Sequence, residues 1–327
     1  MTILLDCDQL EGNVDQDLAL SAMAGAFAAE AAGTTVLPPR TDTESNNGLV
    51  RVMPAVLDDV MGLKVMTLAE GLGTRYLVLL YQVKTGELLA LLDADELTRL
   101  RTGATTALAA RCMVDTPPDR LGVVGSGFEA VGQLRALAGL WALDRVTVFS
   151  PNEQRRTAFA EHMADELGTE VVPVGSSAEA TSDQQVVVLA TKATEPVVDG
   201  ATFAPGAVVL STGSTRLVLR ELDRATLARA GTVVGDDPDQ LVLDSGDVAD
   251  AIESGALSEE RLVPLASAAG DASLLVTDEA RDLLVFKSLG TALQDLALAR
   301  AVYEEALAGG YGTDIGEVAR LKPFAGT

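Results

Sequence analysis

Residues 120–137, RLGVVGSGFEAVGQLRAL, contain a short apolar strand, a glycine-rich turn and the start of a helix. Gly125, Gly127 and Ala130 form the pattern G-x-G-x-x-A where the strand passes into the helix. The first glycine allows a tight turn, the second lets a pyrophosphate approach the backbone, and the small third residue allows close helix–strand packing. Because a helix N-terminus offers N–H groups to phosphates, this stretch predicts a dinucleotide site rather than a merely structural turn.

The residues on either side of this stretch predict two kinds of fold. Downstream, apolar strands (145–150, 170–174, 184–191, 206–212, 231–236) alternate with helical segments such as 152–167, which favours a doubly wound parallel sheet. Upstream, a helix at 16–32 precedes short apolar runs within 49–92, separated by turn signals. We expect a sheet of sequential, antiparallel strands there, then a helix at 95–113, a proline-rich linker at 114–120, and a final helix at 288–307.

The composition excludes several classes of function. A net charge of −24 on 327 residues argues against binding to nucleic acid or to an anionic membrane surface. The apolar runs are far shorter than the ~20 residues of a membrane span, and acids occupy the N-terminus, so we expect a cytoplasmic protein. Cys7 and Cys112 form neither a metal-ligand spacing nor a disulfide framework. Scarce lysine on a dispersed acidic surface suggests a salt-rich cytoplasm; the alternative is an ordinary acidic protein.

The second strand of the nucleotide domain indicates which dinucleotide would bind. It ends at Ser150 in FSPNEQRR, without the acidic residue that usually holds the ribose of NAD. Serine and arginine can bind a 2′-phosphate, so NADP(H) is favoured over NAD(H), although Arg155 and Arg156 could instead form an exposed helix face. The cofactor-binding residues predicted here are Gly125, Ser126, Gly127, Phe128, Glu129, Ala130, Ser150 and Arg155. We expect no metal.

Taken together, the motifs resemble the ornithine cyclodeaminase/mu-crystallin family over most of the chain. The matching stretches are PPR (38–40), RVMPA (51–55), LKV (63–65), KTGELLALLDADELTRLRTGATTALAA (84–110), GSGFEA (125–130), EL (221–222) and FKSLGTALQD (286–295). The resemblance implies a Rossmann-type doubly wound parallel sheet (116–287) inserted in an α+β substrate and dimerisation domain (1–115 with 288–327). It also implies a homodimer formed through the N-terminal sheets and an active site between the two domains.

The resemblance assigns candidate roles to basic residues. Arg40 and Arg101 would hold a substrate carboxylate, to which arginine binds bidentately, and Arg51 resembles the alanine dehydrogenase type. Lys64 matches the catalytic lysine, and its place inside an apolar strand favours a lowered pKa and proton exchange near neutrality. The alternatives are ion pairs for the arginines and a solvent-exposed sheet edge for Lys64. His162, the only histidine, is expected to be structural or exposed.

Further site residues follow from the same resemblance. Ser288 and Gly290 match contacts to the nicotinamide side of the cofactor. Thr102 and Thr191 are also predicted to contact the cofactor. Asp295 either orients a substrate amine or caps an interdomain contact. Thr215 stands where cyclodeaminases have an aspartate that activates the attacking amine. A catalytic role for Thr215 is then limited to hydrogen bonding, and cyclodeaminase activity is disfavoured.

The sequence therefore predicts an NAD(P)-dependent oxidoreductase that acts on the C–N bond of a small α-amino or α-imino acid. One alternative is a cyclodeaminase that uses bound NAD to release ammonia from ornithine. A second alternative is a non-catalytic, NADP-dependent protein that binds a small ligand. The identity of the amino, keto or imino acid and the direction of the reaction stay open.

Overall fold

The computed structural model of this protein describes residues 2–322, which divide into two compact units. Unit 1 comprises the chain up to Arg101 together with the segment from Thr291 onward, and unit 2 runs from Thr102 to Gly290. The division falls inside helix α3 (Asp95–Met113), a continuous helix that contributes residues to both units, and the boundary expected from the sequence lies in the linker after it. Residues 1 and 323–327 of the expected first domain lie outside the described residues.

Unit 1 is built on an eight-stranded sheet with the order β16-β1-β7-β6-β5-β4-β2, and β3 pairs with β4. The pairs from β4 to β7 are antiparallel, as expected, and β1 joins β7 in parallel, which the sequence analysis did not predict. Its strands are β1 (Thr2–Leu5), β2 (Thr35–Val36), β3 (Thr41–Ser45), β4 (Gly48–Leu57), β5 (Val60–Ala69), β6 (Gly73–Gln82), β7 (Leu88–Asp93) and β16 (Thr313–Gly316), and its helices besides the start of α3 are α1 (Cys7–Leu10), α2 (Gln16–Ala31) and α11 (Ala292–Gly309).

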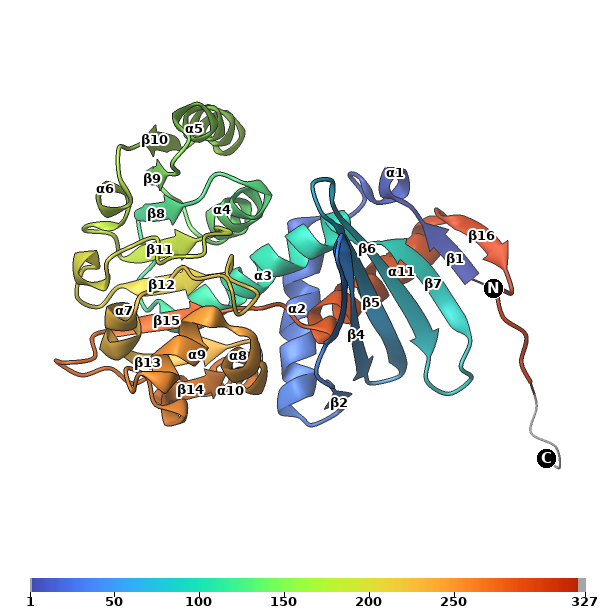
Figure 1. Cartoon of the computed structure of the whole chain (residues 1–327). Coiled ribbons are helices and arrows are strands. Elements are labelled where there is room, and N and C mark those ends of the chain that lie inside the picture. The colour runs from blue at the N-terminus through green and yellow to red at the C-terminus, as the bar shows by residue number, and fades with distance from the viewer. Residues whose placement is uncertain (1, 323–327) are drawn as a thin grey trace. The chain divides into compact units, whose positions relative to one another are not determined.

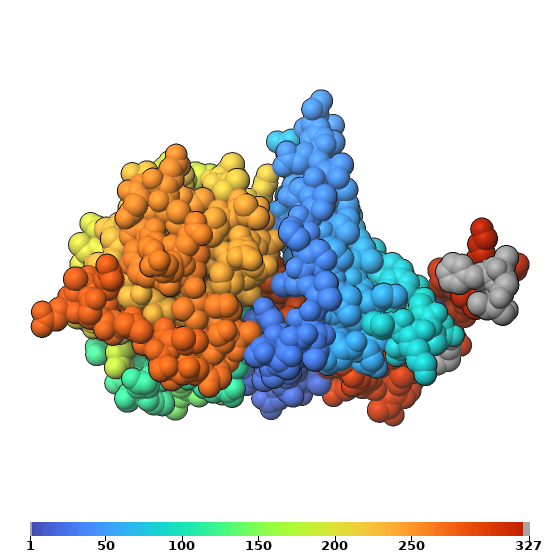
Figure 2. Space-filling model, turned by 90° about the horizontal axis from the view of Figure 1, so that it is seen from below, coloured from blue at the N-terminus to red at the C-terminus, as the bar shows by residue number. Residues whose placement is uncertain are grey.

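The two faces of this sheet differ in what covers them. Alternation along β4 and β5 buries Met53, Ala55 and Lys64 on the face against which α11 packs. The other face carries half-buried apolar side chains, including the cross-strand row Pro54, Leu63, Leu79 and Leu91. No element of unit 1 within residues 2–322 is seen over this outer face in Figure 1, and Figure 2 shows the atoms of this part of the chain, in blue to cyan, from below.

Unit 2 is an eight-stranded, wholly parallel sheet with the order β10-β9-β8-β11-β12-β15-β13-β14. Helices α4 and α5 lie on one side of it and α6 and α7 on the other, which is the doubly wound arrangement (Figure 1). Its strands are β8 (Arg120–Val124), β9 (Arg145–Phe149), β10 (Glu170–Pro173), β11 (Val186–Leu189), β12 (Val208–Ser211), β13 (Ala230–Gly235), β14 (Leu262–Pro264) and β15 (Leu283–Lys287). Its further helices are α4 (Phe128–Leu140), α5 (Glu153–Leu167), α6 (Ser177–Thr181), α7 (Arg224–Arg229), α8 (Pro238–Asp244), α9 (Gly246–Glu253) and α10 (Leu265–Ala268), with 3-10 turns at Gly200–Thr202, Glu259–Arg261 and Ala272–Leu274.

Two features near the end of the chain differ from what the sequence predicts. Strand β15 was not predicted, yet it lies between β12 and β13 in the centre of the sheet. The final helix, expected from Ser288, begins at Ala292. The reason is Asp236, whose buried carboxylate accepts hydrogen bonds from Ser288 Oγ and from the N–H groups of Leu289 and Gly290, so these residues form a bound loop instead of a helical turn. Among the described residues, every helix is too short or insufficiently apolar to cross a bilayer.

Candidate functional site

In unit 1, Lys64 lies on the covered face of the sheet with its ammonium group fully engaged. Its Nζ donates to Thr98 Oγ1 at 2.7 Å and to Asp295 Oδ1 at 2.9 Å, and it lies 4.7 Å from the centre of the Tyr76 ring. The side chain is only 3% exposed. The structure therefore excludes the alternative in which Lys64 simply reaches solvent at a sheet edge.

Arg101 and Asp295 complete this cluster from two helices. Arg101 Nε donates to Asp295 Oδ1 at 3.0 Å, and its Nη1 donates to Gln294 Oε1 at 2.9 Å. Asp295 Oδ2 is buried and has no hydrogen-bond partner among the described residues. We call Lys64, Thr98, Arg101 and Asp295 the Lys64 cluster.

The charge of the Lys64 cluster suits an anionic ligand that also carries nitrogen. Two buried cations, Lys64 and Arg101, share one oxygen of the Asp295 carboxylate. They would attract a substrate carboxylate, and burial strengthens such an interaction because the local dielectric is low. The available Asp295 Oδ2 can accept a hydrogen bond from an amino or iminium N–H.

One member of this cluster, Thr98, and two residues that contact it, Tyr76 and Gln294, were not predicted from the sequence. Thr98 lies one helical turn before Arg101, so the i,i+3 spacing on one helix face was an available signal. Tyr76 lies diagonally across from Lys64 on the neighbouring strand, since Lys64 pairs with Val78. That relationship depends on strand register, which the sequence alone did not supply.

Of the other two predicted arginines, Arg51 is engaged outside the Lys64 cluster. Arg51 Nε and Nη2 each donate to Asp42 at 2.6 Å, and Asp42 is its direct neighbour across the β3–β4 pair. The Arg51 guanidinium is thus committed to a bidentate ion pair that holds β3 to β4. Arg40 lies half-buried in the segment between β2 and β3.

In unit 2, the glycine-rich loop after β8 has the shape that a pyrophosphate needs. Gly125 has φ = 127°, and a Cβ there would lie 2.4 Å from the carbonyl oxygen of Ala190, so only glycine fits. At Gly127 a Cβ would meet no atom within 4 Å, so the approach to the backbone is open. Gly127 also caps α4 without a side-chain hydrogen bond, which leaves the first N–H groups of a 13-residue helix without a side-chain cap. These residues fit a dinucleotide.

The end of β9 carries hydroxyl and guanidinium groups. Ser150 Oγ and Ser126 Oγ share a hydrogen bond of 2.7 Å across the ends of β9 and β8. The Arg155 side chain is exposed in the first turn of α5. Arg156 instead donates to the Ser150 carbonyl and lies over the Phe149 ring.

The other predicted cofactor residues of unit 2 differ in how far they are already engaged. Thr191 donates its hydroxyl to Glu221, and the Ser288 hydroxyl and the Gly290 N–H donate to Asp236. Thr215 is half-buried in the loop after β12. The remaining predicted positions are Thr102, buried in α3, Phe128 and Glu129 in the first turn of α4, and Ala130, buried behind them. Within residues 2–322 no group of three or more His, Cys, Asp or Glu side chains could hold a metal ion.

Comparison with known proteins places the chain in a family of enzymes. The ornithine cyclodeaminase/mu-crystallin family matches residues 1–310, and the chain belongs to this family. An alanine dehydrogenase of Archaeoglobus fulgidus is 31% identical over 96% of this chain and 98% of its own length.

Two solved structures share the whole fold. The Delta(1)-pyrroline-2-carboxylate reductase of Thermococcus litoralis, in complex with NADH and L-proline, has a TM-score of 0.90 and 30% identity, with 96% of this chain and all of that one covered. An archaeal alanine dehydrogenase dimer with bound NAD has a TM-score of 0.89 and 29% identity, with 96% and 99% covered. The family resemblance and the Rossmann-type fold expected from the sequence are thereby confirmed.

Proposed function

We propose that this protein is an NAD(P)-dependent oxidoreductase that acts on the C–N bond of a small α-amino or α-imino acid. The observation that carries the proposal is the Lys64 cluster, in which a buried ammonium, a guanidinium and a carboxylate converge. The relatives support it, since pyrroline-2-carboxylate and alanine are both small molecules with a carboxylate beside a C–N bond.

The residues of the Lys64 cluster divide the work of binding and proton transfer. Arg101, assisted by Arg40, binds the substrate carboxylate, and Asp295 Oδ2 accepts a hydrogen bond from the substrate nitrogen. The bound nicotinamide supplies a hydride in reduction or accepts one in oxidation. Lys64 donates a proton to nitrogen in reduction and takes it back in oxidation, and Thr98 and Asp295 hold its Nζ in place. Arg51 stays with Asp42, where it stabilises the β3–β4 pair.

The preference for NADP(H) belongs to this proposal. No acidic side chain follows β9 at the position where one usually binds the ribose hydroxyls of NAD. The hydroxyls of Ser126 and Ser150, with the exposed Arg155, offer donors to a 2′-phosphate.

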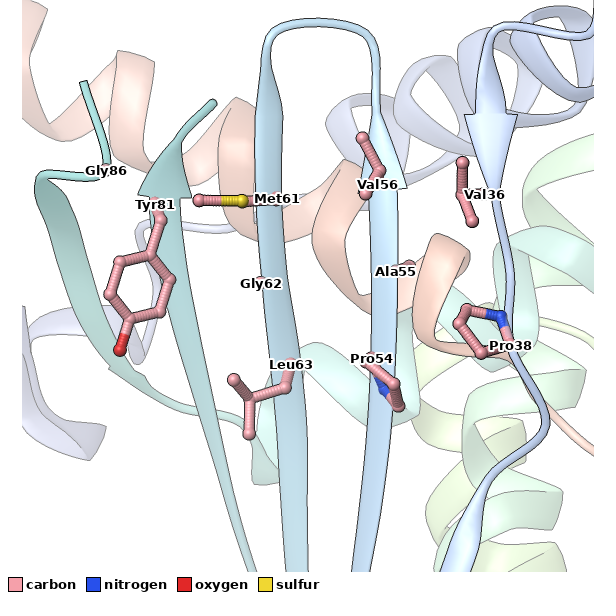
Figure 3. A pocket seen from close by; sticks show the side chains of 10 residues that line it. All are labelled: Val36, Pro38, Pro54, Ala55, Val56, Met61, Gly62, Leu63, Tyr81 and Gly86. Carbon is pink, nitrogen blue, oxygen red and sulfur yellow. The ribbon is translucent and has the colours of Figure 1, made fainter. Parts of the chain in front are cut away.

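We also propose that the protein is a homodimer formed through the outer face of the unit 1 sheet. Figure 3 shows an apolar pocket on this face, lined among others by Pro54, Met61, Leu63 and Tyr81. Monomeric proteins rarely expose contiguous apolar patches of more than a few hundred Å². The dimeric archaeal alanine dehydrogenase supports the proposal.

The experiment that tests the proposed function follows nicotinamide absorbance in concentrated KCl. For reduction, NADPH or NADH is combined with pyruvate or another keto acid plus ammonia, or with a cyclic α-imino acid. For oxidation, NADP⁺ or NAD⁺ is combined with amino acids, including ornithine. Net reduction or oxidation with any pair establishes the oxidoreductase, and the ratio of kcat/KM for NADPH and NADH gives the preference. Release of ammonia from ornithine without net redox change would identify a cyclodeaminase instead. Cofactor binding without turnover of any substrate would favour the non-catalytic binding protein.

A further inference from the structure

Glu221 is a fully buried carboxylate that ties together the ends of two neighbouring strands of unit 2. After β11, the N–H and the hydroxyl of Thr191 both donate to its Oε1. At the end of β12, Ser211 Oγ donates to Oε2 at 2.7 Å, and the N–H groups of Gly213 and Ser214 donate to the same atom at 2.9 and 3.3 Å. One carboxylate therefore fixes the path of both loops.

A second layer of buried charge holds Glu221 itself. Asp247 Oδ1 accepts from the N–H groups of Glu221 and Leu222, and its Oδ2 lies 2.7 Å from Lys287 Nζ. Lys287, at the end of β15, also donates to Ser211 Oγ at 2.8 Å. Two carboxylates and one ammonium, none of them more than 1% exposed, would be costly to bury without this set of donors and acceptors. Both oxygens of Glu221 accept hydrogen bonds, and Asp247 Oδ2, which accepts none within the described part of the chain, is ion-paired with Lys287. A polar network this densely connected favours one arrangement of the strand ends.

The strand order shows why that arrangement matters. A dinucleotide binds across the carboxyl ends of a doubly wound sheet, at the point where the strand order reverses. Here the phosphate loop follows β8, the ribose-binding end belongs to β9, and β11, β12 and β15 continue on the opposite side of β8. The loops held by Glu221 therefore lie on the nicotinamide side. Gly213 leaves no space for adjustment, because a Cβ there would lie 2.0 Å from the Thr191 carbonyl oxygen.

We propose that Glu221 is a positioning residue for the nicotinamide half of the cofactor. It contacts neither cofactor nor substrate; it sets the backbone groups of the loops at Thr191 and Gly213 against which the nicotinamide ribose and ring lie. This inference rests on the proposed function, because it requires that the protein binds a nicotinamide dinucleotide.

The test compares two ligands on one variant. Glu221→Gln keeps the shape of the side chain but replaces one acceptor oxygen with an NH₂ group, which repels the donors at Thr191 or Gly213. Calorimetric titration measures the Kd of NADPH and the Kd of 2′-phospho-ADP, which lacks both the nicotinamide ring and its ribose. We expect the Kd of NADPH to rise about tenfold or more, as for the loss of one charge-assisted hydrogen bond, and the Kd of the fragment to stay unchanged.

Asp223→Asn is the matched control. Asp223 lies two residues further on and also accepts several hydrogen bonds, from Gly200 N–H and from the N–H and hydroxyl of Thr226, but it touches neither strand end. This variant is expected to lower Tm and to leave both affinities unchanged. If Glu221→Gln does not fold, Ser211→Ala removes one donor to Glu221 and is expected to give a smaller change of the same kind.

Each outcome is decisive. Equal weakening of NADPH and the fragment would overturn the inference in favour of a general structural role, and so would unchanged affinity for both. Failure of the unmodified protein to bind NADPH and NADH would overturn the proposed function as well, which separates the two kinds of failure.

Discussion

Lys64 and Asp295 are 231 positions apart in the chain, and their side chains form a 2.9 Å ion pair that is almost completely buried. Breaking a buried pair by removing one partner typically costs about 3–5 kcal/mol, because the remaining charge is left uncompensated. Arg101 shares the same carboxylate oxygen of Asp295, so Lys64 can be replaced while Asp295 keeps a cation. This shared geometry makes the role of Lys64 testable by substitution.

Replacement of Lys64 with methionine should remove most activity and preserve the fold. Methionine fills the apolar surroundings of β5 but cannot exchange a proton, and a positioned general acid or base contributes about 10²–10⁴-fold to the rate. We expect kcat to fall by that order, with the Kd of NADPH unchanged in a direct titration. Lys84→Met, at an exposed lysine, serves as the control. A Lys64→Met enzyme with full kcat would refute proton transfer by Lys64.

Replacement of Arg101 with glutamine should weaken substrate binding specifically. Hydrogen bonds to charged groups contribute about 1.5–3 kcal/mol, so the KM of the carboxylate substrate is expected to rise roughly 10- to 100-fold. Arg99→Gln is the control, because Arg99 lies on the same helix and pairs with Glu96. An unchanged KM in Arg101→Gln would remove this residue from the carboxylate site.

An aspartate on the outer face of the unit 1 sheet should separate the proposed dimer. Leu79 is the direct cross-strand neighbour of Leu63 and Leu91, so Leu79→Asp places a charge within an apolar row. Sedimentation equilibrium is expected to give a dimer mass for the unmodified protein and a monomer mass for Leu79→Asp. Leu217→Asp, at an exposed leucine of unit 2, should remain dimeric. A monomeric parent protein, or a dimeric Leu79→Asp, would count against this interface.

Asp95 should make stability depend on pH in a defined direction. Partial desolvation raises the pKa of the Asp95 carboxyl, and the nearby carboxylates of Asp93 and Glu96 raise it further. A carboxyl whose pKa is higher in the folded state destabilises the fold above that pKa, and this penalty disappears below the ordinary value of 3.8. Asp95→Asn is therefore expected to raise Tm at pH 7, with a gain that shrinks as the pH falls toward 3.8.

The control for this prediction is Asp17→Asn, which changes an exposed aspartate in the first turn of α2. Its loss removes a favourable charge from a helix N-terminus, so no gain in Tm is expected. If Asp95→Asn raised Tm by the same amount at all pH values, its effect would not come from titration of the Asp95 carboxyl.

High salt should stabilise the whole protein. A net charge of −24 repels itself in the folded state, and at about 1 M salt the screening length falls to about 3 Å. We expect Tm to rise when KCl is increased from millimolar to molar concentration, measured by calorimetry. Sucrose at matched osmolality separates charge screening from solvent exclusion, and a Tm that does not respond to KCl would argue against adaptation to a salt-rich cytoplasm.

Local patterns determined much of this protein. The glycine motif and its flanking strand and helix could be predicted directly, and the helix expected after the glycine turn is α4, because strand and helix periodicity and the positive φ of Gly125 are properties of neighbouring residues. The motif order also indicated the family. Lys64, Arg101 and Asp295 could be predicted as site residues because they lie in the stretches that match the family.

Tertiary structure decided which of these groups meet. Strand β15 enters the middle of the unit 2 sheet, Asp236 delays α11 until Ala292, and Arg51 is committed to Asp42. The contact of Thr98 with Lys64 and the oxygen of Asp295 that is unpartnered among the described residues could not be predicted, because they depend on how β5, α3 and α11 pack together. Periodicity reports which face of an element is buried, whereas hydrogen-bond partners and ion pairs depend on strand register and on contacts between residues hundreds of positions apart, which no local pattern encodes.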